Sequence, residues 1–228
     1  MIRRTTILTR SLILLAIAAA SVITARTVIA AVHAATMPAD QALQLLLDGN
    51  QRFVEGKLEH PNQTPERRTE VAKGQHPFAS VLACSDSRTP PEIIFDRGLG
   101  DIFTVRVAGN VADQVVIESL DYSVKHLGVR VVMVLGHRRC GAVIAAVQGH
   151  EGPVDEDEGP LLSELRPAVA ASKGMPGDPV ENAVRENVIL VMKKLATSEE
   201  LSGMVKSGEL KIVGGVYDLS TGKIEMLK

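Results

Sequence analysis

The sequence predicts an α/β fold, in which helices flank a mostly parallel central β-sheet that ends in one antiparallel edge strand. Short apolar runs typical of buried strands alternate with longer segments of helical periodicity, which favours parallel strands. The last two strand-like runs are separated by only a few turn-forming residues, which favours an antiparallel pair. Apolar residues make up 45% of the 228 residues and charged residues 23%, so a mainly disordered chain is excluded.

Residues 1–34 have the layout of a secretory signal peptide. A basic start precedes an apolar run over residues 11–25, which Arg26 ends, and cleavage is expected after Ala34. A membrane anchor is the alternative, but a span needs about 20 apolar residues and Arg26 comes too early. We therefore expect an exported, periplasmic or extracellular protein without a stable membrane anchor, whose residues 35–228 form a single domain.

Helices and strands alternate in the first half of this domain. Leucines at helical spacing predict an amphipathic helix over residues 40–55. The short apolar runs 79–84 (ASVLAC) and 102–107 (IFTVRV) predict buried strands. Residues 113–127 again have helical spacing, and they stop before Gly128, a residue type that commonly ends helices.

The second half contains the clearest strand and the predicted sheet edge. Residues 129–135 (VRVVMVL) read as a fully buried strand. The segment Asp178–Glu181 predicts the start of a helix, because it contains an N-cap Asp, a first-turn Pro and a capping-box Glu. Residues 211–217 (KIVGGVY) and 223–227 (KIEML) predict two strands joined by a tight turn.

The charge balance argues against a nucleic-acid partner. The formal net charge is −2 at pH 7, from 25 basic and 27 acidic residues, and no basic block follows the first 30 residues. The two cysteines are too few for a disulfide framework, although they could form one bridge.

Three potential metal ligands follow two of the predicted strands. Cys84 closes one strand, and His137 and Cys140 follow another. Because ligand sites of open parallel sheets lie beyond the carboxyl ends of the strands, we expect these side chains to converge. Two thiolates and one imidazole make a zinc-ligand set that is short of one member, as in catalytic sites that leave a position for water.

Asp86 and Arg88 come directly after the first of these cysteines. If the segment is extended, Arg88 can hold Asp86 through a bidentate pair, which keeps the carboxylate off the metal but next to its water. The alternative is an exported binding module with a Cys84–Cys140 disulfide and no catalysis. Such a bridge explains neither His137 nor the Asp–Arg pair.

With these motifs the sequence resembles the β-class carbonic anhydrases. The Cys-x-Asp-x-Arg motif at 84–88 and the His-x-x-Cys motif at 137–140 match the signature of that family. The similarity runs from about Gln41 to the C-terminus and includes the stretches 106–110 and 213–218. The resemblance implies one Zn²⁺ per subunit, reversible hydration of carbon dioxide to bicarbonate and a proton, and a homodimer or homotetramer.

The resemblance also implies a substrate pocket of the plant-like, constitutively open type. That group has a Gln nine residues before the first Cys, a Phe nineteen residues after it and a Tyr fifteen residues before the His; Gln75, Phe103 and Tyr122 occupy these positions. Bicarbonate-gated members have a Trp three residues before the first Cys, where this sequence has Val81. We therefore expect water in the fourth zinc position and no gating of that kind.

Our hypothesis for the mechanism gives each of these residues a task. Asp86 would accept a hydrogen bond from the zinc-bound hydroxide that attacks carbon dioxide, and Arg88 would keep Asp86 in place and ionised. Gln75 would donate a hydrogen bond to a substrate oxygen, while Phe103 and Tyr122 would shape a small apolar pocket. Hydrolysis of a related molecule such as carbonyl sulfide or carbon disulfide is the alternative at the same site.

Overall fold

One β-sheet organises the chain. The computed structural model describes residues 37–149 and 159–227, and five strands in this part form a sheet in the order β2-β1-β3-β4-β5. The first four strands are mutually parallel, and β5 is antiparallel to β4. The predicted fold class is therefore confirmed. The strands are β1 (Ala79–Ala83), β2 (Ile102–Arg106), β3 (Val131–His137), β4 (Lys211–Tyr217) and β5 (Ile224–Met226).

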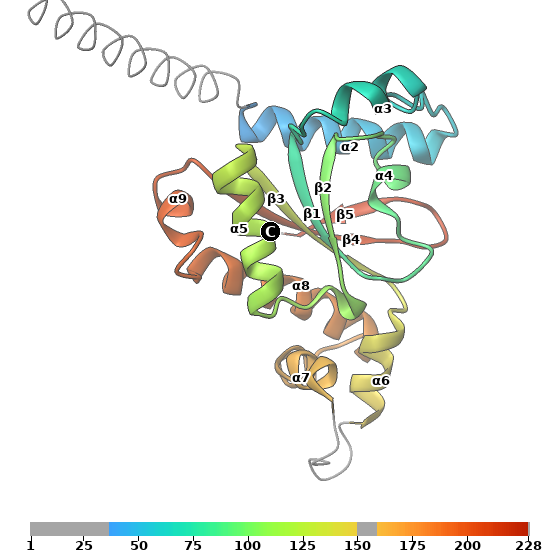
Figure 1. The fold of residues 1–228 in the computed structure, drawn as a ribbon. Helices are drawn as coiled ribbons and strands as arrows, with labels where there is room; N and C mark the ends of the chain where they lie inside the picture. Colours follow the sequence, from blue (N-terminus) through green and yellow to red (C-terminus); the bar gives the residue numbers. More distant parts are fainter. Residues whose placement is uncertain (1–36, 150–158, 228) are drawn as a thin grey trace, which may run out of the picture. The chain divides into compact units, whose positions relative to one another are not determined.

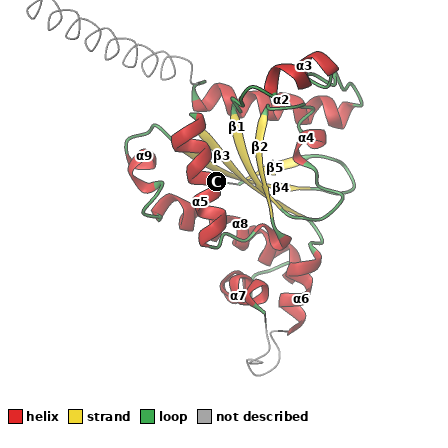
Figure 2. Cartoon of the chain, viewed as in Figure 1, coloured by secondary structure: helices red, strands yellow, loops and turns green. Residues whose placement is uncertain are grey.

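Helices cover the sheet, as Figure 2 shows with the strands in yellow among red helices. Figure 1 shows α6 and α7 beyond the end at which β2 and β3 finish. The α-helices are α2 (Ala39–Glu55), α3 (Pro65–Val71), α4 (Pro91–Ile94), α5 (Gln114–Leu127), α6 (Gly141–Gly149), α7 (Pro160–Ser172), α8 (Pro179–Thr197) and α9 (Ser202–Lys206), and η1 (Ala108–Asn110) is a short 3₁₀ helix.

Alternate residues of the central strands enter two separate cores, because successive side chains of a strand point to opposite faces. Leu82 of β1 packs in the core that contains residues of α5 to α8. Val81 packs in the other core, with residues of α2 and α4. Both β1 and β3 are buried along their whole length. This double burial explains why their sequences are continuous apolar runs rather than alternating ones.

The register of the sheet brings the ends of two strands level. Ala83, the last residue of β1, pairs with Leu135 of β3. Cys84 therefore follows β1 at the height of the end of β3, where His137 is the final strand residue. The predicted strand 129–135 is shifted by two residues, because pairing with β4 continues to His137 and Tyr217. Tyr217 itself is buried in the core.

The remaining predicted segments have different outcomes: one helix is confirmed, one helix was not predicted, and the signal peptide falls outside the residues that the structure describes. The helix predicted over 113–127 is confirmed as α5, capped by Asp113. The sequence did not predict α7, whose interior contains Pro167, a residue type that normally interrupts helices. The predicted signal peptide lies outside the described residues. Among the described helices, none combines the length and apolar character that a membrane span requires.

Candidate metal centre

Three side chains converge beyond the carboxyl end of the sheet. Cys84 follows β1, His137 ends β3, and Cys140 immediately precedes α6. All three are buried, and their ligand atoms lie within 4.8 Å of one another. The two sulfur atoms are 3.9 Å apart, and both cysteines are free thiols. The predicted convergence is confirmed, and the distances are short enough for the three atoms to share one ion.

His137 is oriented for metal binding. Its Nδ1 lies 3.0 Å from the carbonyl oxygen of Arg138, and because a carbonyl only accepts hydrogen bonds, Nδ1 must carry the proton. The other nitrogen, Nε2, is buried and has no hydrogen-bond partner among the described residues. A buried imidazole nitrogen with a free lone pair is costly unless a ligand occupies it. The residues present therefore fit a zinc ion.

The two sulfur atoms share a hydrogen bond. This hydrogen bond above all, together with the N–H groups of Asp86 and Gly109, lowers the pKa of Cys84 despite its burial. The same hydrogen bond and burial raise the pKa of Cys140. A divalent cation between the sulfurs would replace the proton of this hydrogen bond, since metal ligands must be deprotonated.

Asp86 lies beside the metal position and is held by Arg88. The guanidinium donates from Nε to Oδ1 at 2.9 Å and from Nη2 to Oδ2 at 2.6 Å. This bidentate pair, above all, lowers the pKa of Asp86 well below its usual range. Oδ2 of Asp86 is 3.8 Å from Nε2 of His137. An ionised carboxylate therefore lies beside the unpartnered ring nitrogen of the metal-ligand set.

Two further residues fix the segment between Cys84 and Asp86. Arg106 donates from Nε to the Cys84 carbonyl at 3.0 Å and from Nη2 to the Asp86 carbonyl at 2.5 Å. The Thr89 hydroxyl donates to the Asp86 carbonyl at 3.0 Å. The sequence placed Arg106 within the 106–110 stretch of family similarity but assigned it no role, and it did not single out Thr89.

A backbone N–H supports the first sulfur. Gly109 donates its N–H to Sγ of Cys84 at 3.2 Å, and its φ of +65° is a left-handed conformation that favours glycine. The buried side chain of Asn187, on α8, donates to the Gly109 carbonyl at 2.7 Å. Helix α8 thus helps to aim a hydrogen bond at the Cys84 sulfur, through a residue 78 positions beyond Gly109 in the chain.

The predicted capping box at the start of α8 is only half correct. Asp178 caps the helix, since its Oδ1 accepts from the N–H groups of Val180 and Glu181 at 2.8 and 3.0 Å. Glu181, however, does not complete a reciprocal box. Its carboxylate instead accepts the Arg139 N–H at 3.1 Å and lies 3.6 Å from Nε of Arg138. The Glu181 carboxylate therefore contacts the metal-binding loop rather than the N-terminus of its own helix.

The three predicted pocket residues lie elsewhere within one chain. Phe103 pairs with Ser80 near the start of β1, four residues before Cys84, or roughly 13 Å along the strand. The rings of Phe103 and Tyr122 are 6.2 Å apart, and Tyr122 is 47% exposed. Gln75 is exposed in the segment that precedes β1. A single chain therefore does not bring these residues to the metal ligands.

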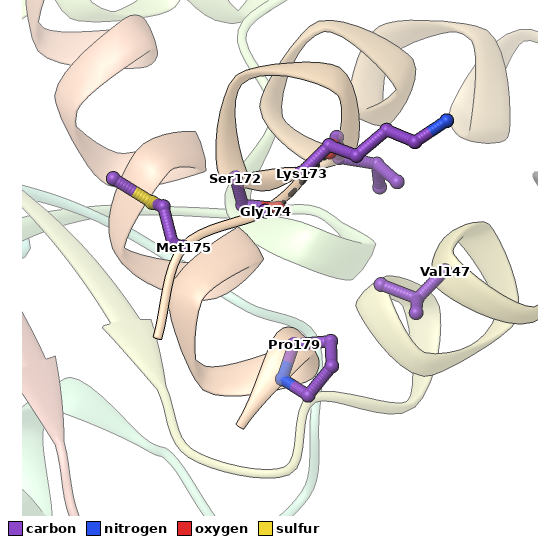
Figure 3. Close-up of a pocket in the computed structure, with 7 residues that line it drawn as sticks. Val147, Ser172, Lys173, Gly174, Met175 and Pro179 are labelled. Atoms are coloured by element: carbon purple, nitrogen blue, oxygen red, sulfur yellow. Dashed lines mark hydrogen bonds between the residues drawn. The ribbon is translucent and has the colours of Figure 1, made fainter. Parts of the chain in front are cut away.

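A separate cavity lies between helices. It has a volume of about 490 Å³ and is lined by Val147 of α6, Ser172 of α7 and Pro179 of α8, among others (Figure 3). None of the three metal-ligating side chains is among its lining residues.

Comparisons with known proteins agree with this geometry. The carbonic anhydrase family model matches residues 79–224. The chain is 38% identical over 188 residues to carbonic anhydrase 2 of Mycobacterium tuberculosis, covering 80% of this chain and 89% of that protein. It is 36% identical over 192 residues to the carbonic anhydrase of Mycolicibacterium smegmatis, covering 81% and 91%.

Solved structures extend the comparison to the fold. The β-carbonic anhydrase CcaA superposes with a TM-score of 0.64 at 26% identity, covering 82% of this chain and 95% of that one. The β-carbonic anhydrase CafA of Aspergillus fumigatus superposes with a TM-score of 0.60 at 34% identity, covering 72% and 81%. The chain therefore belongs to the β-class carbonic anhydrases, and its Cys–His–Cys group is the ligand set with which that family binds zinc.

Proposed function

We propose that this enzyme hydrates carbon dioxide reversibly at the centre formed by Cys84, His137 and Cys140. The observation that carries the proposal is an ionised carboxylate, Asp86, held 3.8 Å from the free nitrogen of a three-membered zinc-ligand set. Zinc, when bound, supplies a Lewis acid that lowers the pKa of water and so provides a nucleophile near neutral pH.

Asp86 orients the attacking water. Its Oδ2 accepts a hydrogen bond from Arg88 and, like any carboxylate oxygen, has a further lone pair for a second donor. Arg88 also donates its own backbone N–H to Oδ1 at 3.0 Å, so the carboxylate is fixed by three hydrogen bonds. Because the pKa of Asp86 is lowered, this carboxylate stays an acceptor throughout the neutral range and does not compete for the proton that the reaction releases.

The substrate pocket is completed by a second copy of the chain in this proposal. Phe103 lies near the other end of the sheet from the metal of its own chain and contacts Tyr122. Phe103 is half-buried, whereas Tyr122 and Gln75 are exposed, so that a partner could bring these residues to another metal centre. Tyr122 and Val115 of α5 are 47% and 69% exposed, which leaves apolar area available for such an interface. A homodimer is the smallest assembly that satisfies this requirement, and a homotetramer contains it.

Export is part of the proposal as well. The basic start and apolar run within residues 1–34 support secretion with cleavage after Ala34. N-terminal sequencing of protein recovered from the periplasm or medium should begin at Ala35. Recovery of uncleaved chain from the cytoplasm alone would contradict export without affecting the assignment of the reaction.

Stopped-flow hydration of carbon dioxide by zinc-loaded protein tests the proposed reaction. We expect rapid hydration that increases toward alkaline pH, because the nucleophile must be deprotonated. Carbonyl sulfide and carbon disulfide, assayed in parallel, should react far more slowly. Faster turnover of either sulfur compound, or a carbon dioxide rate that is flat between about pH 6 and 9, would contradict the proposal.

A further inference from the structure

A glutamate from α8 contacts the peptide group that orients the metal-binding histidine. The peptide between Arg138 and Arg139 has two polar atoms: its carbonyl oxygen accepts from Nδ1 of His137 at 3.0 Å, and its N–H donates to Oε1 of Glu181 at 3.1 Å. A continuous hydrogen-bonded chain therefore runs from the carboxylate, through one peptide, to the imidazole. Glu181 lies 44 residues beyond His137 in the sequence, so only the fold creates this contact.

The conformation of the loop makes an external support necessary. Arg139 has a φ of +52°, in the left-handed region that is unfavourable for residues with a side chain. Its side chain is exposed, so no packing of that side chain compensates for the conformation. The Arg139 N–H donates to Glu181, and this hydrogen bond holds the peptide in the orientation that His137 requires.

Arg138 ties the same loop to the end of β4. Its N–H donates to the Tyr217 carbonyl at 2.9 Å. Its Nε lies 3.6 Å from Oε2 of Glu181 and 3.4 Å from Oδ2 of Asp218. The second oxygen of Glu181 therefore has a cationic partner, which keeps the carboxylate over the loop while the first oxygen accepts the Arg139 N–H.

The charge of Glu181 acts on the histidine through the peptide. An anion on the N–H side of an amide polarises the group and makes its carbonyl a stronger acceptor. A stronger acceptor at Nδ1 fixes the tautomer and the orientation of the ring, so that Nε2 is presented to the metal, as carboxylates do when they contact metal-binding histidines directly. Here one peptide group stands between the carboxylate and the ring.

We propose that Glu181 is a positioning residue for the zinc site, which acts on His137 through the Arg138–Arg139 peptide. The proposal rests on the zinc site of the proposed function. It predicts that loss of Glu181 weakens metal binding itself, whereas a role limited to stabilising α8 would leave the metal affinity of the folded protein unchanged.

The experiment compares Glu181→Leu with a matched control, Glu164→Leu. Glu164, on α7, is also a partly exposed helical acid. Its carboxylate pairs with Lys194 on α8, 2.8 Å away, and not with the metal-binding loop. Zinc affinity is measured by competition with a chelator, and the Co²⁺-substituted proteins are compared by visible absorption. We expect Glu181→Leu to bind zinc about 10- to 100-fold more weakly and to alter the Co²⁺ spectrum. The control should match the wild type in both.

A third variant covers the possibility that Glu181→Leu does not fold. Glu181→Gln keeps an acceptor for the Arg139 N–H but removes the charge, so we expect a smaller loss of zinc affinity and a smaller spectral change. Zinc affinity of Glu181→Gln equal to that of the Glu164→Leu control would overturn the proposal. If the wild type itself bound no zinc, the proposed function would fail instead, so the two failures are distinguishable.

A rescue experiment separates loop positioning from general destabilisation. Glycine adopts a φ of +52° without strain, so Arg139→Gly should make the loop less dependent on Glu181. In the Glu181→Leu background, we expect Arg139→Gly to recover about fivefold in zinc affinity, the order of the cost of a left-handed residue. A double variant that binds zinc no more tightly than Glu181→Leu would overturn the claim that Glu181 holds the loop.

Discussion

The two ends of the sheet differ in how much of a functional site one chain can assemble. At the carboxyl end, Cys84, His137 and Cys140 meet within 4.8 Å, and Asp86 lies beside them. Near the opposite end, Phe103 and Tyr122 contact each other at a partly exposed surface. The strand register brings Cys84 and His137 to the same edge of the sheet, whereas Phe103 and Tyr122 lie away from the metal ligands of their own chain.

The comparison also shows how the two ends are stabilised. At the metal end, side chains of Arg106, Thr89 and Asn187 donate to backbone carbonyls around Cys84 and fix the local geometry. The Phe103–Tyr122 pair is in ring contact, an interaction whose geometry is less sharply defined than that of a hydrogen bond. A metal site needs defined ligand positions, while an apolar pocket tolerates small displacements. Directional hydrogen bonds therefore occur where a metal site needs fixed ligand positions, and ring contact occurs where an apolar pocket needs only approximate ones.

The largest expected effect is at the metal end. Cys84→Ser should abolish zinc retention and carbon dioxide hydration together, because a serine hydroxyl does not ionise near neutral pH and cannot replace the thiolate. Zinc per chain and the stopped-flow rate are the measurements, and circular dichroism controls for folding. A folded variant that retained zinc and full activity would contradict the assignment of Cys84 as a ligand.

Asp86→Ala should separate metal binding from turnover. The carboxylate is near the metal position but is held by Arg88, so zinc should be retained at one ion per chain. We expect the hydration rate to fall about 100- to 1,000-fold, a usual range for loss of one preorganised hydrogen-bonding group at the reacting atoms. Near-normal turnover of the zinc-loaded variant would refute the role of Asp86.

Mixed dimers test whether the two ends cooperate across chains. Asp86→Ala in one chain and Phe103→Ala with Tyr122→Ala in the other should each impair their own homodimers. If the pocket comes from the second copy, the mixed dimer has one site with both defects and one with none. Isolated with two affinity tags, it should have about half of the wild-type activity by two-fold symmetry. Activity no higher than the mean of the two homodimers would place the pocket residues in their own chain.

A smaller effect is expected away from both sites. The side chain of Asp96 is fully buried and accepts hydrogen bonds from Arg52 at 2.6 Å and from the N–H groups of Glu59 and His60. Burial alone would raise the pKa of Asp96, but these donors together lower it. Asp96→Asn should reduce the free energy of unfolding by about 2 kcal/mol near neutral pH and leave zinc content unchanged.

The pH dependence of this effect has a defined sign. Because the pKa of folded Asp96 is lowered, its stabilisation is present above the unfolded pKa of about 3.9 and is lost as the pH falls through the lower folded value. Urea unfolding of the wild type and Asp96→Asn should therefore differ most above about pH 5 and converge in acid. A difference that increased on acidification would contradict the assigned ionisation.

The sequence predicts the metal end well for a physical reason. Apolar runs identify β1 and β3, and a parallel sheet places the residues that follow them at one edge, so Cys84, Asp86 and His137 could be located without coordinates. Arg106, Asn187 and Glu181 could not be identified in this way. Their roles depend on contacts with backbone groups that are distant in sequence, and in the sequence Glu181 reads as an ordinary capping residue. The pocket residues were identified by family resemblance, and the fold of one chain does not bring Phe103 to the metal ligands.

The most direct test of the central claim is X-ray absorption at the zinc edge of the purified protein. The account predicts one zinc per chain with two sulfur neighbours at about 2.3 Å and two nitrogen or oxygen neighbours at about 2.0–2.1 Å. These distances correspond to Cys84, Cys140, His137 and one solvent position. Protein without zinc, or zinc surrounded only by nitrogen and oxygen, would contradict the account.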